Sequence, residues 1–326
     1  MTYRDPDVTH AQNTYAAASP ITDGKLVIAW FGSAGLVAYD RNGRELWRRD
    51  LGRQKHVWGY ASSPVLHGDS LFLSFGPGDR AFLLALDKNT GKTLWQVGAP
   101  KGVGTAGGSW TAADMYGSWS TPIIIHAAGR DELVLTWPRK VFAFDPVTGK
   151  VLWTCDGLGD QIYPSPIFVP QGDGGIVIAP SGFGDSIMAI KAGGNGDVTS
   201  THRLWRNPKT RGTIPSGVIS GNYLFVVDNN GIAECLELMT GKNVWTSRLR
   251  GSGDDNGMWS SLVLNEGKIY AMNKSAEVFL FKPGPQFELL GSNSLSEETN
   301  SSLVISNGEI FIRTFNSLWC IGKITH

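Results

Sequence analysis

The sequence predicts an all-β fold, a β-propeller of four-stranded antiparallel blades, and three observations support this prediction. A short motif recurs along the whole chain of 326 residues with a period of about 46 residues. Glycine accounts for 41 residues and proline for 16, which favours many tight turns and short strands. No segment keeps an apolar period of 3.6 residues, so almost no helix is expected.

The repeat motif reads apolar-Ala-apolar-Asp, then a Thr-Gly-Lys turn, then Leu-Trp. Its clearest copies lie at residues 36–47, 84–95 and 142–153, and looser copies lie at 188–205, 235–245 and 279–290. A seventh copy, at 318–322, has only the first half of the motif. The position equivalent to the motif's aspartate falls at residues 40, 87, 145, 191, 237, 282 and 322. Seven repeats therefore fill the chain, and we expect a single domain over residues 1–326.

Each repeat also has an upstream half. A Ser-Pro or Ser-Ser pair is followed by a Gly turn and an apolar run, as at residues 19–29, 63–73, 165–178 and 260–270. Together with the motif, this makes four short runs per repeat that are rich in β-branched and aromatic residues. Four antiparallel strands per repeat are typical of a propeller blade, because one such sheet buries both faces only by stacking on its neighbours.

The two ends of the chain leave the blade count open. The seventh repeat lacks a Leu-Trp segment for its outer strand. If seven blades close, residues 1–14 would supply that strand and so remove an exposed sheet edge. The alternative is an eight-bladed propeller whose first blade is missing from this chain.

Charge and hydropathy exclude several classes of protein. The 29 Lys and Arg residues balance the 29 Asp and Glu residues, so no basic surface for nucleic acid is expected. No apolar run reaches the 18 residues of a membrane-spanning helix. The N-terminus has no apolar segment typical of a signal peptide, which by itself would place the protein in the cytoplasm.

The motif Ala-apolar-Asp-x-x-Thr-Gly-x-x-Leu-Trp resembles the repeat of the pyrroloquinoline quinone (PQQ)-like β-propellers. This family includes quinoprotein dehydrogenases and the outer-membrane assembly lipoprotein of the BamB type. The resemblance covers residues 15–322, and segments at 19–24, 31–35, 119–122, 193–199 and 312–313 resemble uncharacterised exported bacterial members. It implies a periplasmic or exported protein whose relatives carry a signal peptide and a further blade.

The repeated residues themselves are expected to be structural. We expect the motif's tryptophans to pack against the neighbouring blade and its turn. The motif's aspartates are expected to accept backbone hydrogen bonds within their turns.

Residues outside the repeat consensus are better candidates for binding. They lie in connections that join an outer strand to the next inner strand, or a second strand to a third, and we expect these connections at one mouth of the propeller. Aromatic side chains mixed with Arg, Asp and Asn suit a glycan, a small polar ligand or a protein partner. The candidates are His56, Trp58, Arg80, Trp110, Tyr116, Trp119, Arg139, Tyr163, Asp185, Arg211, Asp228, Asn229, Asn256, Trp259, Asn273, Lys274 and Arg313.

The longest insertion, at residues 98–118, is expected to form a loop over that mouth. Within it, residues 102–107 match G-x-G-x-x-G, but no strand-helix unit surrounds the match. Nucleotide binding is therefore not expected.

No catalytic pattern is present in the sequence. It contains neither a G-x-S-x-G elbow nor an H-E-x-x-H zinc motif, and its six histidines have no metal-ligand spacing. Quinoprotein dehydrogenases carry an adjacent Cys-Cys pair beside PQQ, whereas Cys155, Cys235 and Cys320 are far apart, so no cofactor is expected. We expect a non-catalytic binding scaffold for protein or ligand contacts. The alternative is an enzyme or sensor that binds a glycan or small polar ligand, and a PQQ-dependent oxidoreductase is the least favoured.

Overall fold

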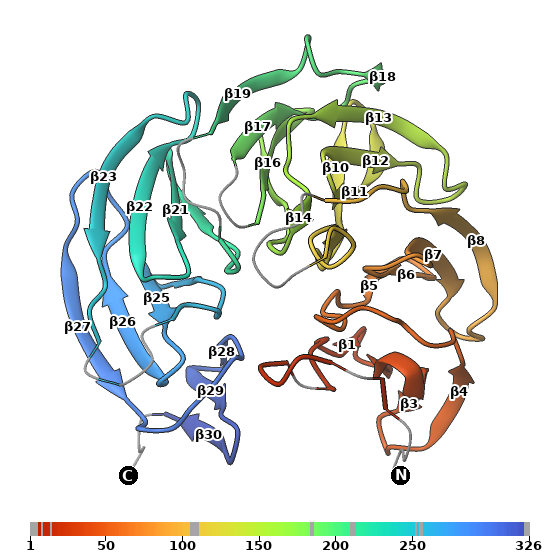
Figure 1. Ribbon diagram of the computed structural model, residues 1–326, viewed down its shortest axis with the longest axis horizontal. Helices are drawn as coiled ribbons and strands as arrows, with labels where there is room; N and C mark the ends of the chain where they lie inside the picture. The colour runs from red at the N-terminus through yellow and green to blue at the C-terminus, as the bar shows by residue number, and fades with distance from the viewer. Residues whose placement is uncertain are drawn as a thin grey trace. The chain divides into compact units, whose positions relative to one another are not determined.

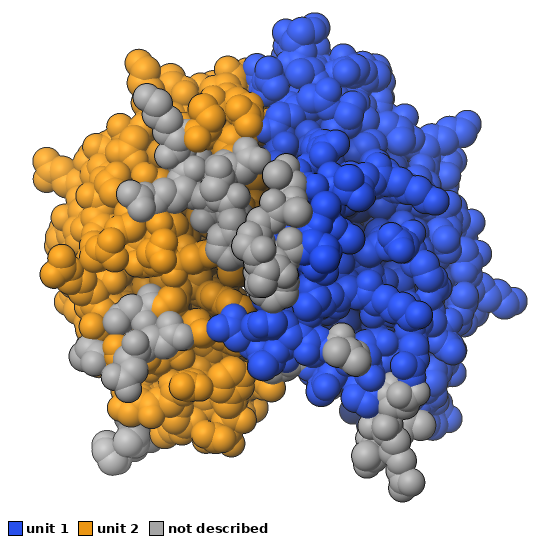
Figure 2. Space-filling model, in the orientation of Figure 1, with its two compact units in different colours: residues 1–179, 191–203 blue, residues 180–190, 204–326 orange. Residues whose placement is uncertain are grey.

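The computed structural model describes residues 6–7, 9–13, 15–104, 111–182, 186–208, 213–251, 253 and 257–322. The chain divides into two compact units, which are described one at a time (Figure 2). Unit 1 comprises residues 1–179 and 191–203, and unit 2 comprises residues 180–190 and 204–326. The fold is all-β, as predicted, and the described residues contain one short 3₁₀ helix, η1 (Gly32–Ala34).

Unit 1 holds three complete antiparallel blades (Figure 1). Their strands are β1 (Ile21–Thr22), β2 (Leu26–Trp30), β3 (Leu36–Asp40) and β4 (Glu45–Arg49) in the first; β5 (Val65–His67), β6 (Ser70–Phe75), β7 (Phe82–Asp87) and β8 (Thr93–Gly98) in the second; and β10 (Ile123–Ala127), β11 (Arg130–Trp137), β12 (Lys140–Phe144) and β13 (Val151–Asp156) in the third. Two short strands outside the blades, β9 (Gly117–Ser118) and β14 (Gln161–Ile162), pair in parallel.

Unit 2 holds the later blades (Figure 1). Their strands are β20 (Val218–Ser220), β21 (Tyr223–Val227), β22 (Ile232–Glu237) and β23 (Asn243–Arg248); then β24 (Val263–Asn265), β25 (Lys268–Met272), β26 (Glu277–Phe281) and β27 (Leu289–Ser294); then β28 (Val304–Ser306), β29 (Glu309–Arg313) and β30 (Leu318–Ile321). The fourth repeat is divided, with β15 (Ile167–Pro170) and β16 (Gly175–Pro180) almost wholly in unit 1 and β17 (Ile187–Lys191) and β19 (Arg203–Asn207) almost wholly in unit 2.

Strand register explains the alternation of small and large residues in the motif. The motif's alanine on the third strand lies opposite its tryptophan on the fourth, as Ala38 opposite Trp47 and Ala85 opposite Trp95. In the sixth repeat, which has no such tryptophan, Leu280 takes the alanine's place and lies opposite Gly291. The cross-strand pair therefore keeps one large and one small partner, as close packing of adjacent blades requires.

The motif's tryptophans join one blade to the next, which confirms the prediction. Trp47 Nε1 donates to Lys88 O at 2.8 Å, and Trp95 Nε1 donates to Pro146 O at 3.0 Å. In unit 2, the indoles of the fourth-strand tryptophans of the fourth and fifth repeats bond to Leu238 O and Gly284 O in the same way. Each acceptor lies in or beside the turn between the third and fourth strands of the following blade.

The motif's aspartates cap those turns, which is also as predicted. Asp40 Oδ1 accepts from the backbone N–H groups of Asn42 and Arg44, both at 2.9 Å. Asp87 and Asp145 accept from the N–H groups two and three residues further on. These bonds to the charged carboxylate lower the pKa of each aspartate.

Trp153 is an exception that reflects a change in the next repeat. The fourth repeat has no Thr-Gly-Lys turn, and its strand β18 (Gly196–Asp197) instead extends the third blade in parallel with β13. Trp153 Nε1 donates at 2.8 Å to Oε2 of Glu132, a fully buried residue on β11. Arg130 donates to Oε1 of the same carboxylate at 3.0 Å. This buried charge therefore has partners on both of its oxygens.

The hydrophobic core lies between successive blades. In unit 1, one cluster joins the first and second blades around Trp30, Leu36 and Phe75, and another joins the second and third around Phe72 and Leu135. In unit 2, separate clusters join the fifth blade to the sixth and the sixth to the seventh. The stacking predicted from the repeats is thus the source of apolar burial.

The ends of the chain differ from the regular blades. The seventh sheet has three strands among the described residues, and β30 forms one of its edges. In the segment 1–14, residues 6–7 and 9–13 form no strand. They contact the loop after the first blade, where His10 N donates to Val57 O at 2.7 Å and Asn13 Nδ2 donates to Trp58 O at 2.7 Å. Pairing of residues 1–14 with the seventh sheet, and a single domain over 1–326, stay predictions.

Candidate functional site

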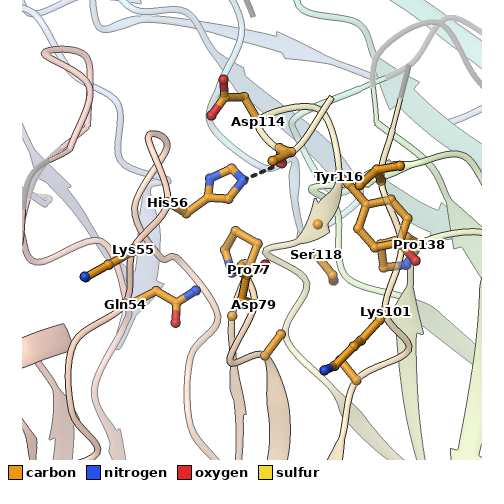
Figure 3. Close-up of a pocket in the computed structure, with 18 of the residues that line it drawn as sticks. Gln54, Lys55, His56, Pro77, Asp79, Lys101, Asp114, Tyr116, Ser118 and Pro138 are labelled. Atoms are coloured by element: carbon orange, nitrogen blue, oxygen red, sulfur yellow. Dashed lines mark hydrogen bonds between the residues drawn. The ribbon is translucent and has the colours of Figure 1, made fainter. Parts of the chain in front are cut away.

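The loops of unit 1 enclose a cavity of about 820 Å³ (Figure 3). Two kinds of connection build it, as the sequence predicts. Residues 53–57, 99–103 and 113–118 lie in connections from an outer strand to the next blade, whereas residues 76–81 and 137–138 lie where a second strand connects to a third. The described parts of the 98–118 insertion therefore form part of the cavity wall.

Among the sequence candidates that the structure describes, His56 and Tyr116 line this cavity. Apolar lining is supplied by three prolines and several small aliphatic residues, and polar lining comes from both acidic and basic groups. The polar and charged lining residues are Asp7, Arg53, Gln54, Lys55, His56, Asp79, Lys101, Asp114, Tyr116 and Ser118.

A parallel pair of short strands fixes the far wall of the cavity. Gly117 N donates to Asp160 O at 3.0 Å, and Trp119 N donates to Ile162 O at 2.8 Å, on either side of the β9–β14 pair. The Gln161 side chain, which is 7% exposed, adds a bond from Nε2 to Asp114 O at 3.4 Å. This wall is therefore tied to the connection that follows β13.

Two arginines among the candidates hold the loops together. The Arg80 guanidinium donates to Arg53 O and Leu51 O, both at 2.9 Å, and so clamps the 51–53 loop. Arg139 donates to Asp160 Oδ1 at 2.7 Å and to Val103 O at 3.0 Å, and its guanidinium carbon lies 5.6 Å from the centre of the Tyr116 ring. Both side chains therefore position the cavity wall.

An aromatic cluster supports the cavity beside its lining. Trp119, which is 6% exposed, donates from Nε1 to Gly59 O at 3.1 Å and stacks on Tyr163 with ring centres 4.8 Å apart. The His56 ring meets Trp119 edge-on at 5.2 Å. Trp58 lies next to His10, with ring centres 4.7 Å apart. These candidates form packed supports for the loops.

Three titratable groups of the cavity, on His56, Asp114 and Tyr116, keep their ordinary protonation at neutral pH. Burial lowers the pKa of His56, so its imidazole is neutral, and its Nε2 faces Ala113 O at 3.4 Å. Hydrogen bonds from Thr111 lower the pKa of Asp114, so the carboxylate stays charged. Burial raises the pKa of Tyr116, so the phenol stays protonated. None of these three groups is poised to exchange a proton near pH 7.

In unit 2, two polar candidates hold hairpin turns. Asp228 Oδ1 accepts from the N–H groups of Asn230 and Ile232, both at 2.8 Å, in the β21–β22 turn. Asn273 Oδ1 accepts from Glu277 N at 2.9 Å in the β25–β26 turn. Both are nearly fully buried, so their side chains mainly shape the backbone.

The other candidates of unit 2 cross-connect loops. Asn229 Oδ1 accepts from Ile214 N at 2.9 Å, and Lys274 places its ammonium 5.3 Å from the centre of the Trp259 ring. Arg313 is exposed, and its carbonyl accepts from Thr299 Oγ1 at 2.7 Å. The remaining candidates, Trp110, Asp185, Arg211 and Asn256, lie outside the described residues.

The sequence did not point to Gln54, which lines the cavity with its side chain 3% exposed. The sequence feature that could have indicated Gln54 is its position two residues before His56, in the same connection.

Over the described ranges, no group of three or more His, Cys, Asp or Glu residues is placed to hold a metal ion. Nor is any helix in that part of the chain long and apolar enough to cross a membrane.

Solved structures with a similar fold include three that differ in activity. BamB from Moraxella catarrhalis superposes with a TM-score of 0.69 at 15% identity, over 93% of this chain and 84% of that chain. A europium-containing methanol dehydrogenase gives 0.67 at 13% identity, over 90% and 72%, and the C-terminal WD40 domain of Sif2 gives 0.66 at 11% identity, over 92% and 79%. At these identities the likeness shows the β-propeller fold alone.

Sequence comparison defines the family. A search of curated protein sequences gives no match. The family model described as outer membrane protein assembly factor BamB matches residues 79–325, which is more than half of the chain and includes six of the seven motif copies. The chain therefore belongs to this BamB family of PQQ-like repeat proteins.

Proposed function

We propose that this protein is a non-catalytic scaffold that binds a protein partner through loops between the second and third strands of its blades. The observation that carries the proposal is a pair of exposed aromatic side chains on such loops. Phe31, after β2 in unit 1, is 41% exposed, and Phe315, after β29 in unit 2, is 46% exposed. Aromatic side chains of this kind are enriched among the residues that dominate protein interfaces.

Backbone hydrogen bonds fix both loops. Phe31 N donates to Gly35 O at 3.0 Å, and Phe31 O accepts from Ala34 N at 3.1 Å. Phe315 N donates to Glu298 O at 2.9 Å, and Thr314 N donates to Ser317 O at 2.8 Å. An aromatic ring on a preorganised loop loses less conformational entropy when a partner covers it.

Two further features support a binding role. The family is described as an outer membrane protein assembly factor, a function that depends on contacts with other proteins. The cavity's histidine, aspartate and tyrosine are held in their ordinary protonation states, which disfavours acid-base catalysis.

We also propose that the protein works without PQQ. The quinone is a tricarboxylate, whereas the cavity of unit 1 is lined by as many acidic as basic residues. A lining without an excess of positive charge does not favour such a ligand. The three cysteines do not line the cavity either: Cys155 and Cys235 are buried within blades, and Cys320 is on β30.

The scaffold proposal is tested by cross-linking and affinity capture from the source cells. Phe31→Ala and Phe315→Ala should each reduce the recovery of a protein partner at least tenfold. Leu94→Ala is the control, because Leu94 is 53% exposed but lies on the outer strand β8. Equal recovery by all three variants, or no partner recovered with the unmodified protein, would contradict the proposal.

A location outside the cytoplasm follows from the same family description, and we propose the periplasm. Fractionation of the source cells, followed by detection of the natural protein, should find it with periplasmic markers. Recovery with cytoplasmic markers alone would refute this location.

A further inference from the structure

The strongest unassigned feature is the side chain of Gln54 at the wall of the unit 1 cavity. The residue is 3% exposed, and neither its Oε1 nor its Nε2 has a hydrogen-bond partner among the described residues. A buried amide without partners is costly, and such groups are uncommon in folded proteins. The buried Gln161 nearby, in contrast, bonds to Asp114 O.

A glycine is needed beside this amide. Gly78 lies against it, and a Cβ built at Gly78 would come within 2.7 Å of Gln54 Nε2. Figure 3 shows the amide nitrogen directed toward Pro77 and Asp79, on the side of the other lining residues. The cavity wall therefore contains one amide donor and one amide acceptor that have no partner in the protein and are covered in the ligand-free state, so that a ligand reaches them when the Gln54 side chain turns into the cavity.

The charges around the cavity are balanced. Three basic and three acidic residues line it: Arg53, Lys55, Lys101, Asp7, Asp79 and Asp114. Asp7 Oδ2 is a further buried atom without a described partner. Within the described ranges, neither Lys55 nor Lys101 forms an ion pair. Such a lining favours a ligand that carries both charges over a purely anionic, cationic or neutral one.

We propose that this cavity binds a short peptide with free termini. The N–H and C=O of the peptide backbone pair with Oε1 and Nε2 of Gln54, and its ammonium and carboxylate meet the acidic and lysine side chains of the lining. Apolar side chains of the ligand pack on Pro77, Pro100 and Pro138. A volume of about 820 Å³ is within the usual range for small-ligand sites.

This proposal is independent of the protein scaffold, because neither Phe31 nor Phe315 lines the cavity. It also accounts for a buried amide without a partner at position 54. Removal of an amide that has no partner should leave the free energy of unfolding of the ligand-free protein unchanged or raise it. Removal of an amide with a structural role should lower that free energy.

The test uses the full chain and a panel of tripeptides with free termini and Ala, Leu, Phe or Lys at the centre. Calorimetric titration should show saturable binding of at least one of them, and the N-acetylated, C-amidated form of that peptide should bind at least tenfold more weakly. Gln54→Met should lower the affinity at least tenfold, with a thermal midpoint equal to or above that of the unmodified protein. Gln96→Met, on the exposed face of β8, is the control and should bind normally.

Several results would overturn the proposal. They are no binding by any tripeptide, unchanged affinity in Gln54→Met, or a clear fall in its thermal midpoint. Binding of di-N-acetylchitobiose in place of the peptides would assign the amide to an acetylated sugar and would also overturn it. Partner capture through Phe31 and Phe315 is measured separately, so either proposal can fail alone.

Discussion

The contact between a motif tryptophan and the glycine of the next turn gives the sharpest test of how the blades are joined. Gly149 has φ +70°, and a Cβ at this residue would lie 2.7 Å from both Cδ2 and Cε3 of Trp95. Gly129 also has φ +70°, but a Cβ there would meet no atom within 4 Å. The two glycines therefore share their backbone strain and differ in the contact with tryptophan.

The expected losses of unfolding free energy follow from the backbone strain and from the contact with tryptophan. A left-handed conformation costs an alanine about 1–2 kcal/mol, which both variants experience. Overpacking against Trp95 adds about 1–3 kcal/mol in Gly149→Ala alone. We therefore expect Gly149→Ala to lose about 2–5 kcal/mol of unfolding free energy and Gly129→Ala to lose about 1–2 kcal/mol.

Thermal and urea unfolding of the two variants measure this difference. A third variant, Trp95→Leu, removes the ring and its bond from Nε1 to Pro146 O. Combined with Gly149→Ala, it should show a coupling of about 1–3 kcal/mol, because the leucine leaves space for the new methyl group. Equal losses at Gly149 and Gly129, or strictly additive effects with Trp95→Leu, would refute the packing argument.

Three further predictions concern charge, pH and thiol exposure. Arg130→Met leaves the buried Glu132 carboxylate without its cation and should cost about 3–5 kcal/mol in urea unfolding, whereas Lys282→Met removes an exposed ion pair and should cost less than about 1 kcal/mol. Similar losses would contradict this. Because burial lowers the pKa of His56, the unfolded chain binds the proton more readily. The stability contributed by this residue is present above the ordinary histidine pKa of about 6.5 and is lost as the pH falls. A pH series of thermal midpoints should show a shallower fall below pH 6.5 in His56→Gln, and parallel curves would oppose the assignment. Native protein should react with Ellman's reagent at Cys320 alone, since the other two thiols are buried and burial raises their pKa; fast reaction of two or more thiols would be the contrary result.

Local sequence patterns were sufficient to predict the repeating elements of the fold. The motif's aspartate turns, its tryptophans and its four strands per repeat depend on interactions within one repeat or between adjacent repeats. Such interactions recur with the sequence period, so they are visible in it. The Ala38–Trp47 and Leu280–Gly291 pairs show that even an exception to the motif is compensated locally.

The candidate site was only partly predictable. The sequence correctly indicated which connections come together in unit 1, since strand order determines the side of a blade on which each connection lies. It did not indicate what each side chain does there. Arg80 and Arg139, selected as ligand contacts, bond to backbone carbonyls and to Asp160, because those groups approach only after folding.

The sequence by itself determined the all-β class, the seven repeats, the positions of the turns and the family, because all of these are encoded in periodic local patterns. Only the tertiary structure decided which polar groups are satisfied. Gln54 and Gln161 are both buried glutamines of unit 1, yet one has no described partner and the other bonds to Asp114 O. Hydrogen bonding depends on distances of a few tenths of an ångström between segments far apart in sequence, and no periodic pattern encodes such distances.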